Sequence, residues 1–143
     1  MHMNEVIVPI HVGILLATLT CVAWADIYAS MWLHGTKTIL SKTILARLHI
    51  AVTSGLIGML VTGVLLFWPL QEYLVSQSNA FFAKMFFVFA LVVNSFVIEK
   101  YMAIATTQSF KEVPIRQKVV LFVSGGASSL SWIGAIIAAT QLL

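Results

Sequence analysis

The sequence predicts an all-α integral membrane protein, a four-helix bundle whose helices run up, down, up and down. Two observations predict it. Of the 143 residues, 60% are hydrophobic and only 9% are charged, whereas soluble domains carry about 25% charged residues. Four apolar segments also reach the roughly 20 residues that a bilayer-spanning helix needs. The composition excludes a soluble globular domain, a disordered chain and a nucleic-acid-binding domain. It indicates a single transmembrane domain over residues 1–143.

Polar or helix-breaking residues separate the four spans. The first break begins at His34 and Gly35, the second runs from Pro69 to Asn79, and the third contains Pro114. Glycine and proline at such places favour turns over continued helix. We therefore expect spans over residues 6–33, 44–70, 80–105 and 119–143.

The basic residues predict the orientation of these spans. Seven of the eight Lys and Arg residues lie in or beside the first and third connections, and only Lys84 lies near the second. Basic residues gather on the cytoplasmic side of membrane proteins. Both termini are therefore expected on the non-cytoplasmic side. We expect the protein in a prokaryotic inner (plasma) membrane.

Small residues recur at helical spacing in the second and fourth spans. Examples are Ser54, Gly58 and Thr62 in the second, and Gly134 and Ala138 in the fourth. Such residues let helices approach closely in lipid. They favour packing within the bundle, with a second copy or within a larger membrane complex, and they also leave room for a flat cofactor.

Ionisable side chains within the spans form two predicted layers, and such groups are costly in lipid and often functional. The outer layer contains His11 and Lys84. The inner layer contains both acidic and basic groups, namely Asp26, Arg47, His49, Glu99 and Lys100. Because opposite charges can neutralise one another, we expect Asp26 to pair with Arg47 or Lys100, and Glu99 to pair with Arg47.

His11 is the residue that we expect to bind a cofactor or a metal ion. Helix-bundle cores commonly hold haem or metal ligands, and histidine often holds haem iron. The alternative is a neutral histidine that is hydrogen-bonded at the interface. Because His49 lies near the opposite face of the membrane, the two histidines cannot ligate one iron. Lys84 is either functional or an anchor whose ammonium reaches the interface.

Several short motifs carry a family resemblance. They are Ile10-His11-Val12, Trp32-Leu33-His34, Arg47-Leu48, the apolar run Thr62–Trp68, Lys84-Met85 and Glu112-Val113-Pro114. The pattern resembles the HemJ-type membrane protoporphyrinogen oxidases and the CopD-like group of small four-span proteins. The resemblance implies that His11 is an axial ligand of haem b. It also implies that Lys84 is a catalytic residue that pairs with a carboxylate of the substrate or cofactor.

Three functions are open from the sequence. The first is a redox protein that binds haem b and either oxidises a porphyrinogen or passes electrons to quinone; as an enzyme it would be an oxidoreductase. The second is a non-enzymatic membrane module that packs with itself or with a larger complex. The third is a proton or ion path through His11, Asp26 and Glu99.

Overall fold

The computed structural model describes residues 3–141. They form four long helices, with a short 3₁₀ turn, η1, before the last one: α1 (Met3–Leu33), α2 (Lys42–Ser76), α3 (Ser78–Ala105), η1 (Phe110–Glu112) and α4 (Ile115–Thr140). Each helix is long and apolar enough to cross a membrane. The all-α, four-span prediction is confirmed. The side of the membrane on which the termini lie stays a prediction.

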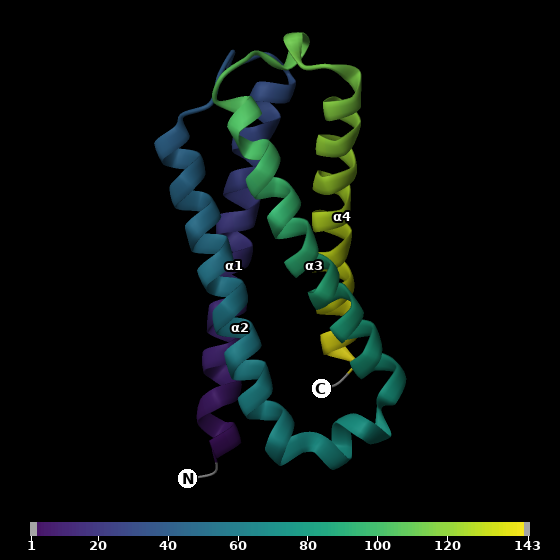
Figure 1. Cartoon of the computed structure of the whole chain (residues 1–143). Coiled ribbons are helices and arrows are strands. Elements are labelled where there is room, and N and C mark those ends of the chain that lie inside the picture. Colours follow the sequence, from purple (N-terminus) through teal and green to yellow (C-terminus); the bar gives the residue numbers. More distant parts are fainter. Residues whose placement is uncertain (1–2, 142–143) are drawn as a thin grey trace.

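The helices stand side by side as two antiparallel hairpins. α1 packs along α2 and α3 packs along α4, while the hairpins meet mainly through α2 and α3. Figure 1 shows the start of α1 and the end of α4 at one end of the bundle, here called the terminal end. The first and third connections lie together at the other end, here called the loop end.

The second connection differs from the expectation. Pro69 does not end α2, which continues to Ser76, and α3 begins at Ser78 with only Gln77 between them. A proline removes one backbone donor and kinks a helix without necessarily ending it. Figure 1 shows the final turns of α2 bending across the terminal end. The connection is therefore a bent, mostly helical corner.

The fourth helix begins earlier than expected. Pro114 precedes its first residue, and the Pro114 carbonyl accepts hydrogen bonds from the N–H groups of Gln117 and Lys118, each at 3.0 Å. Proline is well suited to a helix start because its missing N–H would have no helical partner there. Residues 142–143 of the expected span lie outside the described residues.

Close helix contacts depend on small residues. Gly55 of α2 faces the Thr18 side chain of α1, and a Cβ at Gly134 of α4 would lie 2.6 Å from ring atoms of Phe87 on α3. Between α3 and α4, Asn94 and Ser124 form a buried pair of reciprocal hydrogen bonds. Asn94 Nδ2 donates to the Ser124 carbonyl at 3.0 Å, and Ser124 Oγ donates to Asn94 Oδ1 at 2.7 Å.

The outer surface of the bundle is apolar. Trp68, Phe89 and Leu130 are 75%, 68% and 68% exposed. A water-soluble protein rarely leaves so many large apolar side chains uncovered, whereas lipid chains solvate them. The buried side chains instead form two clusters. One lies at the loop end around Tyr28, Trp32, Leu40, Ala105 and Val113, and the other joins Leu56, Leu91 and Trp132.

Candidate functional site

A cavity of about 240 Å³ lies between the two hairpins, in the half of the bundle nearer the loop end. All four helices contribute to its walls, which are largely apolar and aromatic, including Trp32, Leu56, Leu91 and Trp132. The small side chains of Ala29 and Ser128, on α1 and α4, also line it. Apolar cavities with a few polar groups are the usual form of small-molecule sites.

Besides the two tryptophans, the lining residues with polar side chains are Asp26, His49, Thr53, Asn94, Ser95, Tyr101, Ser124 and Ser128. The Thr53 hydroxyl is buried and has no hydrogen-bond partner among the described residues. A buried hydroxyl without a partner is costly, so a ligand or water that bonds to it would stabilise the bundle. Asp26 is the only acidic residue among the described lining residues, and no Lys or Arg lines the cavity.

His11 lies outside this cavity, nearer the terminal end. Its Nδ1 is 2.6 Å from Thr62 Oγ1, and Thr62 Oγ1 donates to the Gly58 carbonyl at 2.8 Å. A threonine hydroxyl has one proton. Because the Gly58 carbonyl takes that proton, we infer that Thr62 accepts the Nδ1–H of His11. This network assigns the tautomer, and it leaves the Nε2 lone pair of His11 for a ligand.

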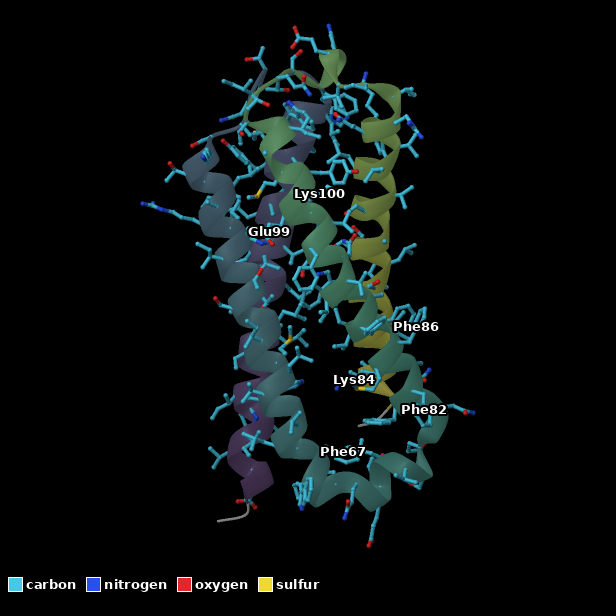
Figure 2. The ribbon with its side chains drawn as sticks, in the orientation of Figure 1. Phe67, Phe82, Lys84, Phe86, Glu99 and Lys100 are labelled. Carbon is cyan, nitrogen blue, oxygen red and sulfur yellow. The ribbon has the colours of Figure 1, made fainter. Side chains whose placement is uncertain are left out.

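Lys84 is the other residue of the predicted outer layer. Figure 2 shows its side chain extending from α3 toward the space between the hairpins. The ammonium lies near enough to His11 for their charges to interact. The structure therefore brings together the two residues of the predicted outer layer. Among the described residues, no group of three or more His, Cys, Asp or Glu side chains could hold a metal ion, so a metal at His11 would need ligands from a cofactor.

The five inner-layer residues do not form one cluster. His49 and the exposed Asp26 line the cavity. Arg47, Glu99 and Lys100 are also exposed but do not line it; the last two lie on α3 (Figure 2). Within residues 3–141, no carboxylate lies within 4.0 Å of a basic nitrogen. The expected pairs of Asp26 with Arg47 or Lys100, and of Glu99 with Arg47, are therefore not formed. Neither Arg47 nor Lys100 joins Asp26 in the lining of the cavity.

Sequence reasoning did not find the cavity itself. Thr53 and Tyr101 are ordinary residues in an apolar pattern, and their convergence depends on how the two hairpins pack. Asp26 and His49 were recognisable as intramembrane ionisable groups, but their shared cavity was not.

Comparison with protein-family models, curated proteins and solved structures finds no match for this chain. The geometry of the cavity and of His11 is therefore the basis for a functional proposal.

Proposed function

We propose that this four-span membrane protein is a redox protein that binds a quinone-class molecule in the cavity between its hairpins. The main support for this proposal is the composition of the cavity. It combines apolar and aromatic walls with a few polar groups, which matches a molecule that has an apolar body and two carbonyl oxygens. A quinone would reach it from the bilayer, where such molecules dissolve.

The polar groups of the cavity match the chemistry of a quinone. The Thr53 and Tyr101 hydroxyls can donate hydrogen bonds to carbonyl oxygens. Reduction of a quinone to a quinol takes up two electrons and two protons. Asp26 and His49 are the lining carboxyl and imidazole groups, which can bind and release protons. Asp26 and His49 would exchange those protons with the bound quinone.

The electrons require a redox group, and His11 supplies the candidate ligand for one. Its Nδ1–H bond to Thr62 fixes the ring and leaves Nε2 available, which is the arrangement that metal-bound histidines usually have. Lys84 would pair with a cofactor carboxylate. A b-type haem held there would supply one-electron chemistry. The resemblance to HemJ-type proteins supports the same two residues, with porphyrinogen as the alternative substrate.

Tryptophan fluorescence tests the quinone site. Trp32 and Trp132 line the cavity, whereas Trp24 and Trp68 are 63% and 75% exposed. In a Trp24→Phe/Trp68→Phe background, only the two cavity tryptophans remain. Decylubiquinone, a soluble quinone, should quench their fluorescence saturably in detergent.

Two matched variants decide where the quinone binds. Ala29→Phe places a ring in the cavity, and Ala23→Phe places the same ring on the exposed face of α1. Overpacking costs about 1–3 kcal/mol, so Ala29→Phe should weaken quinone binding by about tenfold or more, and Ala23→Phe should not. If the quinone quenches the fluorescence of both variants equally, it does not bind in this cavity. Saturable binding of tetraphenylphosphonium without quinone binding would assign the cavity to lipophilic cations instead.

Visible absorption spectra test the haem. Protein purified from cells supplied with a haem precursor should show a Soret band, and α and β bands that sharpen after dithionite reduction. His11→Ala should abolish these bands, whereas His49→Ala, which removes the other intramembrane histidine, should leave them. A featureless spectrum from folded protein would overturn the haem assignment. Failure of both tests would leave the non-enzymatic membrane module and the proton or ion path as the remaining functions.

A further inference from the structure

A second cavity, of about 280 Å³, lies at the loop end of the bundle, and Trp32 separates it from the proposed quinone site by lining both. It is formed where the first connection meets the segment before α4, and Figure 1 shows these connections close together. Three basic side chains line it, from His34, Lys37 and Lys111, along with the hydroxyl residues Thr38 and Ser109. No acidic side chain is among its described lining residues.

The walls of this cavity are held by bonds between the two connections. Trp32 Nε1 donates to the Gln108 carbonyl at 3.1 Å, and the Leu40 N–H donates to the Ala105 carbonyl at 2.7 Å. The Trp32 and Phe110 rings also pack edge to face, with their centroids 5.2 Å apart. The cavity therefore lies in an ordered part of the fold, so a ligand would not have to order the loops when it binds.

Two lysines at or near this cavity contact aromatic rings. Lys37 Nζ lies 4.9 Å from the centre of the Tyr28 ring, a cation–π contact that restrains it. A third lysine, Lys118, places Nζ 5.0 Å from the Phe110 ring and donates to the Lys111 carbonyl at 3.3 Å. Lys37 and Lys111 are both exposed and line the cavity, so a bound anion could contact both ammonium groups.

His34 adds a further donor. Its Nδ1–H donates to the Ser30 carbonyl at 2.8 Å, because a carbonyl can only accept. The other ring nitrogen, Nε2, is left for a ligand and donates when the ring is protonated. Glu112, the acidic residue that follows Lys111 in the chain, accepts the Ser109 N–H at 3.2 Å in a capping box. That hydrogen bond holds the Glu112 carboxylate at the start of η1.

We propose that this loop-end cavity binds a phosphate-bearing anion. Lysine ammonium groups are common phosphate ligands, and hydroxyl groups from Ser109 and Thr38 would complete the hydrogen bonds. The anion has two physical sources, the headgroup of an anionic lipid in the adjoining leaflet or a soluble phosphate. This site is independent of the quinone and haem proposals, because its charged residues line neither.

The test compares two pairs of substitutions in the full chain. Lys37→Gln/Lys111→Gln removes two charges from the cavity. The control, Lys42→Gln/Arg116→Gln, removes two exposed charges near the same end that do not line it. Losing two charged donors should weaken phosphate binding about tenfold or more. The control should change it about twofold at most, since separated surface charges are screened.

Two measurements distinguish the sources of phosphate. Native mass spectrometry compares retention of phosphatidic acid with that of phosphatidylcholine, and the thermal unfolding midpoint is followed against inorganic phosphate with sodium chloride as the control. Selective retention of phosphatidic acid indicates a lipid headgroup. A thermal unfolding midpoint that rises with inorganic phosphate but not with sodium chloride, without phosphatidic acid retention, indicates a soluble ligand. Lys37→Arg/Lys111→Arg, which keeps the charges, should retain either. Absence of both responses in the unmodified chain, or equal loss in the cavity and control pairs, overturns the proposal.

Discussion

The close contact between α1 and α2 predicts that a substitution at Gly55 lowers the free energy of unfolding. A Cβ at this position would collide with the Thr18 side chain, which is only 3% exposed and has little room to move. Two other glycines provide a graded comparison. A Cβ at Gly58 would make an ordinary contact with Ile14 at 3.4 Å, and a Cβ at Gly126 would meet nothing within 4 Å.

The expected magnitudes follow from two opposing terms. Replacing glycine with alanine in a helix gains up to about 1 kcal/mol from backbone propensity, and all three variants share this gain. Overpacking costs about 1–3 kcal/mol, and only Gly55→Ala carries it in full. We therefore expect Gly126→Ala to be neutral or slightly stabilising and Gly58→Ala to be near neutral. Gly55→Ala should be less stable than Gly126→Ala by about 1–3 kcal/mol.

The free energy of unfolding of each variant can be measured by titration with SDS in mixed micelles. Thr18→Ala provides the check on mechanism. Among the described residues, the Thr18 hydroxyl bonds only to the Ile14 carbonyl of its own helix, at 2.7 Å, so its loss alone should be mild. In the double variant, Gly55→Ala should recover much of its stability, with a coupling of about 0.5–3 kcal/mol. If Gly55→Ala and Gly126→Ala unfold alike, or if Thr18→Ala restores nothing, the close α1–α2 packing is wrong.

Three further substitutions test other contacts by the same titration. Asn94→Leu removes both hydrogen bonds to Ser124 and should destabilise the α3–α4 hairpin by about 1 kcal/mol; no loss would place the two side chains apart. Gly35→Ala puts a Cβ on a residue with φ of 76° and should cost about 1–2 kcal/mol; a neutral result would contradict that turn. Trp32→Phe keeps the ring but leaves the Gln108 carbonyl without its donor, at a cost of about 1 kcal/mol; unchanged stability would indicate that this hydrogen bond does not join the connections.

The placement of His11 and Lys84 shows how far sequence reasoning reached into the candidate sites. Counting residues from the ends of the spans put both in one layer of the bundle, because helical rise converts sequence position into depth. The hydrogen bond between His11 and Thr62 was not predictable, since it depends on the rotation of α1 against α2. The expected ion pairs failed for a related reason. Depth alone does not say which way Arg47, Glu99 and Lys100 point around their helices.

The amino-acid sequence by itself determined that the chain forms four apolar helices and where the first and third connections lie. Length and hydropathy are local properties, and a bilayer requires each spanning segment to satisfy its own backbone hydrogen bonds. Only the tertiary structure decided that Pro69 lies within a bent helix, and that the helices pair as two hairpins with a cavity between them. That cavity depends on the match of side-chain shapes across all four helices, where Gly55 and Gly134 allow close contact within each hairpin. Such matches join residues far apart in sequence, and no local pattern records them.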